Sequence, residues 1–332
     1  MPLSSESAEP LSWSELASLA TPEPNRIEGP TSAQATLRLF GQPESNVMVT
    51  LYRDHHAWCP YCQKIWLWLE FKRIPYRIRK VTMRCYGPKE PWFLEKVPSG
   101  MLPALELNGR LITESDDILL ALEQRFGPLG MAMTAPEALE LRRLERLLFQ
   151  AWCIWLCSPR LSPRQQVLAR EQFQDIARRF ERELNKEEGP WLRGPEPQTV
   201  DLIFVPYVER MNASLAYYKG YRLRAEHPAI DRWFRALEQL ETYRGTQSDF
   251  HTHAHDLPPQ MGGCWSDDGE EAKRLAERID RGDGLGEDEA CWDADHQADQ
   301  AVMALSRVLR HQQRLRAVNP MGSAAFDQPL RC

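Results

Sequence analysis

The 332-residue chain lacks the features of a membrane protein, a secreted protein or a nucleic-acid-binding protein. No stretch approaches the ~20 consecutive apolar residues that a membrane helix needs. The first nine residues hold three serines and two glutamates, so the start has neither the apolar core of a signal peptide nor the scarcity of acids of a transit peptide. The net charge of -6 argues against a phosphate backbone as the main partner. We therefore expect a cytoplasmic protein with no membrane span and no nucleic-acid partner.

Cysteine is also scarce, with 8 residues at irregular spacing, too few for a disulfide scaffold in a chain of this length. This usage favours a reducing compartment, where thiols are buried, reactive or metal-bound. What the chain does have is 42% hydrophobic and 27% charged residues, enough for two packed domains with additional segments.

Residues 1–46 are rich in Ser, Pro and Glu and hold one short amphipathic stretch, Leu11–Leu19. They offer too little apolar surface for a core, so we expect a flexible or wrapping arm. Residues 47–127 follow the order βαβαββα, which predicts a small α/β domain with a mixed four-stranded sheet. The Asn108-Gly109 pair between two apolar runs predicts a hairpin. The predicted strands are Val47–Tyr52, Tyr76–Thr82, Leu102–Leu107 and Leu111–Thr113, and the predicted helices are Pro60–Lys72, Pro91–Lys96 and Ser115–Arg125.

Residues 128–245 carry helical periodicity only and predict an all-α second domain. Residues 246–332 predict a loop followed by two charged helices. From residue 266 to the end, 14 acids and 9 basic residues contribute -5 of the net charge, so we expect a separable acidic appendage. The predicted helices are Pro136–Leu156, Pro163–Leu184, Val200–Tyr218, Pro228–Thr242, Asp267–Asp280 and Glu287–Val318.

The Cys59-Pro60-Tyr61-Cys62 motif stands where a strand and a short loop run into a helix. Free backbone N–H groups and the positive end of the helix dipole favour a thiolate at Cys59. Proline is well tolerated at the first helical position. Cys62 lies one turn further along, within reach for dithiol–disulfide exchange. The motif therefore predicts thiol redox chemistry.

A half zinc site is the alternative for this motif, because His55 and His56 precede it. Four ligands within eight residues would distort the helix start, and no second cysteine pair has zinc-ribbon spacing. We therefore predict no metal there.

Two further segments carry weaker signals. Leu102-Pro103 places a proline at the start of a strand, where a cis bond or an edge position is tolerated. Glu114-Ser115 opens a helix, so the Ser115 hydroxyl and nearby N–H groups make either a carboxylate site or an ordinary N-cap.

Several other patterns have both a functional and a structural interpretation. Trp152, Trp155 and Tyr207 either line a second-substrate pocket or pack between domains. The alternating His251, His253 and His255 indicate a loop with incidental histidines rather than a metal site, and Cys153 and Cys157, one helical turn apart, indicate buried thiols.

Together, Cys-Pro-Tyr-Cys, Leu102-Pro103, Glu114-Ser115 and the helical second half resemble the cysteine-type glutathione transferases, the omega, lambda and dehydroascorbate-reductase group. The resemblance covers about residues 47–245. The long ends are most similar to those of the iota-type members from cyanobacteria and algae. Cys62 departs from most omega enzymes and is more like glutaredoxin, which opens a dithiol route.

The resemblance implies a glutathione transferase fold: a thioredoxin-like domain over 47–127, an all-helical domain over 128–245, and the two extensions. It implies glutathione as cosubstrate and Cys59 as the catalytic residue. The implied glutathione-binding residues are Tyr61, Lys89 at the glycine carboxylate, Leu102 before a cis Pro103 at the cysteine backbone, and Glu114 and Ser115 at the γ-glutamyl end.

We therefore expect a glutathione-dependent thiol transferase or reductase that acts on a small electrophile or a mixed disulfide. The competing interpretation is a non-catalytic module of the same fold that binds a pigment, a cofactor or a protein. The sequence leaves the assembly open between a monomer and a homodimer.

Overall fold

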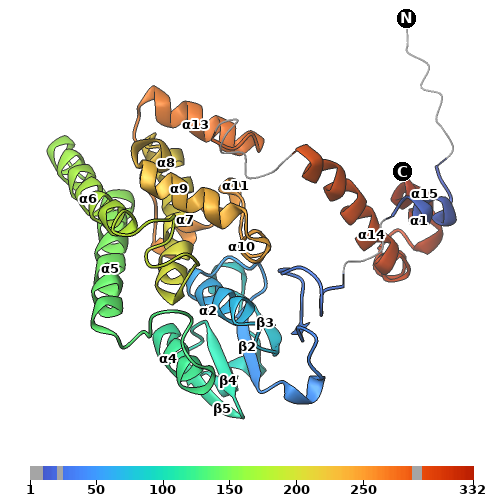
Figure 1. Ribbon diagram of the computed structural model, residues 1–332. Helices are drawn as coiled ribbons and strands as arrows, with labels where there is room; N and C mark the ends of the chain where they lie inside the picture. Colours follow the sequence, from blue (N-terminus) through green and yellow to red (C-terminus); the bar gives the residue numbers. More distant parts are fainter. Residues whose placement is uncertain (1–9, 21–24, 286–293) are drawn as a thin grey trace, which may run out of the picture. The chain divides into compact units, whose positions relative to one another are not determined.

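The computed structural model describes residues 10–20, 25–285 and 294–332. The chain divides into two compact units: residues 25–289 form the larger, and the two ends, 1–24 and 290–332, form the smaller. Figure 1 draws the helices and strands of each unit.

The larger unit begins with a five-stranded sheet of order β1-β3-β2-β4-β5. β2 (Val49–Asp54) runs parallel to β3 (Tyr76–Val81), and β1 (Leu37–Arg38), β4 (Ala104–Leu107) and β5 (Arg110–Thr113) add antiparallel pairings. α2 (Pro60–Phe71) and α4 (Ser115–Phe126) pack on the sheet and on each other. Phe93 of α3 (Pro91–Lys96) packs in a separate apolar cluster with Tyr52 and Val81. This is the predicted thioredoxin-like arrangement, with the hairpin turning at Asn108 (φ 51°) and Gly109 (φ 79°).

The prediction of four strands was wrong, because the segment assigned to the N-terminal extension supplies the edge strand β1. Arg38 is buried and donates to both carboxylate oxygens of Glu70, at 2.9 and 3.0 Å. Thr31 and Tyr76 donate to the same carboxylate, at 2.8 and 2.6 Å. Residues 25–46 therefore belong to the larger unit, held by polar contacts that the apolar pattern of the sequence does not show.

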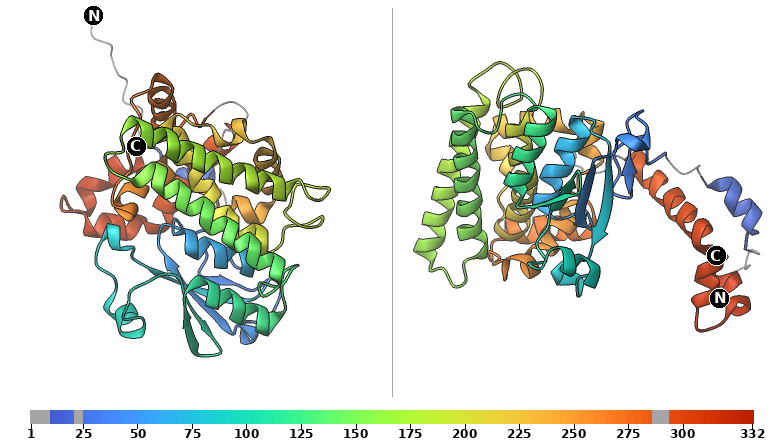
Figure 2. Two further views of the ribbon diagram at one scale, coloured as in Figure 1. Left: turned by 90° about the vertical axis from the view of Figure 1, so that its left-hand side faces the viewer. Right: turned by 90° about the horizontal axis from the view of Figure 1, so that it is seen from below.

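The second half is helical, as predicted. α5 (Pro136–Cys157) and α6 (Pro163–Leu184) form a long antiparallel pair (Figure 2). α7 (Thr199–Lys219) is buried along almost its whole length and contacts both α5 and α2, which explains why it has no exposed polar face. The chain then continues through α8 (Leu223–Glu226), α9 (Pro228–Glu238) and α10 (Glu241–Arg244).

The segment after residue 245 differs from the prediction of a loop and an appendage. Residues 250–261 form two short helices, α11 (Phe250–His255) and α12 (Leu257–Met261). α13 (Glu270–Arg281) packs on α7 through Ala272, Leu275 and Ile279. The first part of the acidic segment therefore belongs to the larger unit, because one stripe of three apolar residues suffices to bury an otherwise charged helix.

The smaller unit joins the two ends of the chain. α1 (Trp13–Leu19) contacts α14 (Ala294–Val318), which contacts α15 (Ser323–Arg331). The indole of Trp13 donates to Asp327 at 2.9 Å, and Asp327 also pairs with Arg316 at 2.9 Å. The predicted start of α14 at Glu287 lies outside the described residues. Within the described ranges, no helix has the length and apolar character that crossing a membrane requires.

Candidate active site

Cys59 is the N-cap residue of α2, and Pro60 follows at its first helical position. Its sulfur lies 4.0 Å from the carbonyl oxygen of Leu102, and the residue is 7% exposed. The Leu102-Pro103 peptide bond is cis. Cys59 therefore stands at the end of α2 where the helix dipole is positive and the first backbone N–H groups have no partner within the helix.

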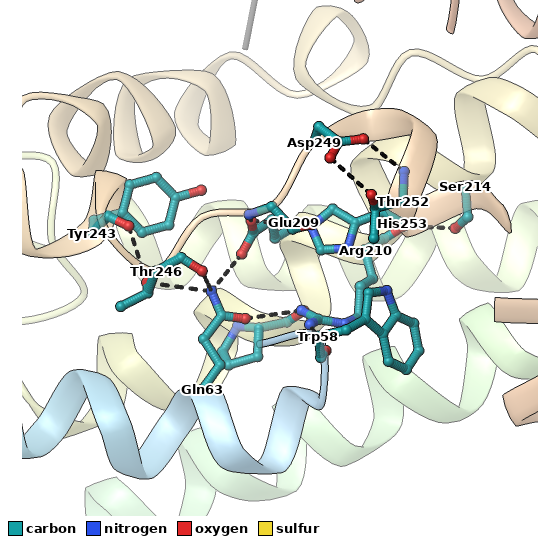
Figure 3. Close-up of polar contacts among 12 residues, drawn as sticks. Trp58, Gln63, Glu209, Arg210, Ser214, Tyr243, Thr246, Asp249, Thr252 and His253 are labelled. Carbon is teal, nitrogen blue, oxygen red and sulfur yellow. Dashed lines mark hydrogen bonds and ion pairs between the residues drawn. The ribbon is translucent and has the colours of Figure 1, made fainter. Parts of the chain in front are cut away.

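The backbone of Trp58, directly before Cys59, is held at both its N–H and its carbonyl oxygen. The Trp58 N–H donates to Asp54 at 2.6 Å, and the guanidinium of Arg210 donates to the Trp58 carbonyl oxygen. Arg210 also donates to the side-chain oxygen of Gln63, one turn into α2, at 3.0 Å (Figure 3). The charge of Arg210 interacts with Cys59. A buried cation from α7 therefore fixes the start of α2 and adds positive charge beside the thiol.

Arg210 belongs to a buried network that reaches α11 (Figure 3). Glu209 accepts from Gln63 at 2.8 Å, contacts the ring of His253 at 3.0 Å and accepts from the Ser248 N–H at 3.0 Å. Burial lowers the pKa of Arg210 and that of His253. Burial opposes ionisation of Glu209, but His253, Arg210 and Gln63 outweigh it, and its pKa is lowered. Arg210 and Glu209 are thus buried opposite charges behind Cys59, bridged by the Gln63 side chain, which accepts from Arg210 and donates to Glu209.

Cys62 lies behind Cys59 inside α2 and is 1% exposed. Burial, followed by the contact with Cys59, raises the pKa of the Cys62 thiol well above its usual range. The two cysteines therefore differ: Cys59 opens to a cavity, and Cys62 is a poorly ionised thiol in the core.

Cys59 lines a cavity of about 760 Å³ between the sheet domain and the helices. Three of the predicted glutathione-binding residues line it too: Tyr61, Lys89 and Leu102. Burial lowers the pKa of Lys89, whose ammonium group donates to the Thr82 carbonyl oxygen at 2.8 Å. Among the residues not predicted are Trp58, Phe149, Arg210, Leu257, Gln260 and Met261.

A smaller cavity of about 300 Å³ holds Pro103, Glu114 and Ser115, and shares Tyr61, Leu102 and Tyr207 with the first. The N-cap of α4 is Glu114 rather than Ser115, and its φ of 63° is rare for a residue with a side chain. Such backbone conformations persist where the surrounding structure enforces them, often at functional sites. The predicted glutathione-binding residues therefore border two adjoining cavities.

The sequence analysis missed the charged lining of the smaller cavity. Lys64 is buried, and its ammonium group lies 2.8 Å from Asp116. Burial lowers the pKa of Lys64, whereas for Asp116 the pairing with Lys64 outweighs burial and lowers its pKa. Glu145 and Arg146 form a second pair at this cavity. Lys64 directly precedes the apolar stretch Ile65–Leu69 of α2. A lysine at the start of an apolar run is the feature of the sequence that could have indicated a buried charge here.

Of the three residues proposed for a second-substrate pocket, Trp152 and Tyr207 line the larger cavity. Trp155 does not belong to the described lining of either cavity. Its ring packs on Phe173 and Tyr221, with centroids 5.6 and 5.4 Å apart. Trp155 lies one turn beyond Trp152 on α5, and its packing agrees with the structural interpretation that the sequence also offered for it.

The predicted histidine loop is the helix α11, and its histidines point to different surroundings. His253 is buried against Glu209, whereas His251 and His255 are exposed and converge with Asp280 of α13. His255 and Asp280 are 2.7 Å apart. In the described part of the chain, this is the one group of three side chains with metal-ligand spacing, and none of the three lines the Cys59 cavity.

Comparison with known proteins agrees with this geometry. Residues 58–125 match the family of the glutathione S-transferase N-terminal domain. The chain is 25% identical over 190 residues to the protein "Glutathione S-transferase DHAR2" of Arabidopsis thaliana, covering 57% of this chain and 84% of that relative.

Solved structures share the fold. The dehydroascorbate reductase of Chlamydomonas reinhardtii superposes with a TM-score of 0.54 at 19% identity, covering 64% of this chain and 97% of that one. Glutathione transferase Omega 3C of Trametes versicolor superposes with a TM-score of 0.52 at 24% identity, covering 73% and 98%. The predicted glutathione transferase fold is confirmed, and residues 58–125 match the glutathione S-transferase N-terminal domain.

Proposed function

We propose that the protein is a glutathione-dependent thiol transferase or reductase in which Cys59 is the nucleophile. The observation that carries the proposal is the position of Cys59 at the start of α2, in a cavity with Lys89 and Leu102 that adjoins the cavity of Ser115. The relative and the structures named above are glutathione transferases and a dehydroascorbate reductase, which supports an enzyme of this class.

The two cavities suit the two ends of glutathione. Ser115 and the N-terminal N–H groups of α4 suit the γ-glutamyl carboxylate, and Glu114 suits its ammonium group. Lys89 suits the glycine carboxylate. The backbone of Leu102 before Pro103 lies between these positions, where it is suited to pair with the cysteine backbone of glutathione, beside the ring of Tyr61. This arrangement directs the glutathione sulfur to Cys59.

The reaction follows from thiol chemistry. The Cys59 thiolate attacks the glutathione sulfur of a mixed disulfide, forms a Cys59–glutathione disulfide and releases the substrate thiolate, which takes up a proton. A second glutathione thiolate then attacks the glutathione sulfur of this adduct, releases Cys59 as a thiolate and leaves as glutathione disulfide. Reduction of dehydroascorbate by two glutathiones has the same electron balance.

The burial of Cys62 favours the monothiol route, in which glutathione itself resolves the adduct. A resolving thiol must ionise to attack, and the raised pKa of Cys62 makes this slow. The aromatic side of the larger cavity, with Trp152, Phe149 and Tyr207, suits an apolar or aromatic second substrate.

Three finer assignments remain part of the proposal: an iota-type subfamily, a cytoplasmic location and a homodimer. Detection of the protein's peptides in fractions of its native cells tests the location. Light scattering of the purified chain tests the homodimer.

The deciding experiment measures glutathione-dependent reduction of a glutathionylated peptide by the full chain and by Cys59→Ser. We expect turnover by the first, loss in the second, and a transient adduct of one glutathione on Cys59 by intact mass. Binding of glutathione without turnover or adduct would instead support the non-catalytic module that binds a pigment, a cofactor or a protein.

A further inference from the structure

A second pair of thiols meets outside the Cys59 cavity. Cys157 is the last residue of α5, and Cys264 follows α12 by three residues. The Trp265 N–H donates to the Leu156 carbonyl oxygen at 2.9 Å, which sets the neighbours of the two cysteines against each other. The side chains of Cys157 and Cys264 share a hydrogen bond, and both residues are partly accessible.

The two thiols are inequivalent. The hydrogen bond from Cys264, and next the charge of Lys219, lower the pKa of Cys157, whereas the same contact raises that of Cys264. Lys219 has no exposed side chain and pairs with Asp267 at 3.0 Å, so its charge is fixed at this place. Cys153, one turn earlier on α5, has a pKa raised by burial to about 12. Cys157 is therefore the reactive thiol of the group.

The pair is connected to the wall of the Cys59 cavity. α12 contributes Leu257, Gln260 and Met261 to that wall, and α5 contributes Phe149 and Trp152. Between α12 and Cys264 the chain passes through Gly262 (φ 79°) and Gly263 (φ 131°), conformations that a residue with a side chain rarely adopts. A bond at Cys264 would thus anchor a short, glycine-linked wall helix to the end of α5.

We propose that Cys157 and Cys264 form a second redox centre, which closes to a disulfide when glutathione disulfide accumulates and so fixes α12 in the wall of the cavity. The Cys157 thiolate attacks glutathione disulfide, forms a mixed disulfide and releases one glutathione thiolate. Cys264 then loses its proton and attacks the Cys157 sulfur, releasing the second glutathione. Two protein thiols are oxidised and one glutathione disulfide is reduced to two glutathiones.

The test uses the full chain with Cys59→Ser and Cys62→Ser, so that no bond can form in the other motif. After incubation with glutathione disulfide, we expect a mass loss of two units and a crosslinked peptide that contains Cys157 and Cys264. Adding Cys264→Ser should abolish the bond, and the matched control Cys153→Ser should retain it. Two free thiols, a stable glutathione adduct, or a bond between Cys153 and Cys157 would overturn the proposal.

The anchoring of α12 by the Cys157–Cys264 disulfide can be measured separately, in a way that does not depend on glutathione catalysis. A disulfide that closes a long loop should raise the melting temperature by roughly 4 °C or more. Hydrogen exchange in residues 257–264 should slow on oxidation, and adding Cys264→Ser should remove both effects. Unchanged exchange in the oxidised protein would refute the anchoring of α12.

Discussion

Arg210 provides the sharpest test of how this fold activates Cys59. Its guanidinium donates to the carbonyl oxygens of Trp58 and Pro206 and to Gln63, and it lies over the Trp58 ring, 5.0 Å from its centroid. In Arg210→Met, these contacts are lost, and Glu209 stays buried without its cation.

Arg210→Met should reduce both the stability of the protein and the reactivity of Cys59. Removing one partner of a buried charge pair costs about 3–5 kcal/mol in the free energy of unfolding, or roughly 6–20 °C in melting temperature for a unit of this size. Loss of the positive charge that acts on Cys59 should be worth about 1.4 kcal/mol, which slows alkylation of Cys59 by roughly tenfold.

The assay follows the rate of alkylation by iodoacetamide at Cys59, by peptide mass, at a temperature where both proteins are folded. Arg224→Met is the matched control, because Arg224 is equally buried and pairs with Asp231 at 2.7 Å and Glu238 at 2.6 Å, outside both described cavity linings. It should lose similar stability and keep the Cys59 rate, and Arg210→Lys should recover part of the rate. If Arg210→Met and Arg224→Met alkylate equally fast, Arg210 is only a structural residue.

Three other predictions concern ligand binding, mechanism and pH. Ser115→Ala or Lys89→Ala should weaken glutathione binding by about 1–3 kcal/mol, measured by calorimetry, because each removes a contact to a carboxylate; unchanged affinity in both would contradict the proposed site. Cys62→Ser should keep most of the turnover that Cys59→Ser loses, since glutathione resolves the adduct, and equal loss in the two variants would require an internal disulfide instead. Burial raises the pKa of Asp201 to about 6 from 3.8. Between these values the folded state holds a proton that the unfolded state has released, so this stabilisation is complete below pH 3.8 and is lost as the pH rises through 6. The free energy of unfolding of Asp201→Asn relative to the native chain should therefore change by roughly 2.4 kcal/mol between pH 4 and 8, and a constant difference in urea titrations would rule out the shift.

Helix starts and tight turns were predicted correctly from the sequence, because they depend on the backbone preferences of a few neighbouring residues. The predicted helices at Pro91–Lys96 and Pro163–Leu184 have the observed bounds, since a proline marks each start and the apolar spacing continues to each end. The Asn108-Gly109 turn and the helix after Cys59 follow from the backbone preferences of the residues themselves. The list of glutathione-binding residues came from a family resemblance and not from spacing.

The sequence by itself thus determined the sheet-then-helix order, the position of Cys59 at a helix start and the apolar stripes of the long helices. Only the tertiary structure decided that Arg210, 151 positions beyond Cys59, supports it, that Cys157 meets Cys264, and that residues 25–46 and α13 belong to the larger unit. The physical reason is that a periodic apolar stripe shows which face of an element is buried but carries no record of its partner. Buried charges such as Arg210 and Glu209 leave no periodic signal, because the groups that hydrogen-bond to them, such as Gln63 and the Trp58 carbonyl, are distant in the chain and adjacent only in the fold.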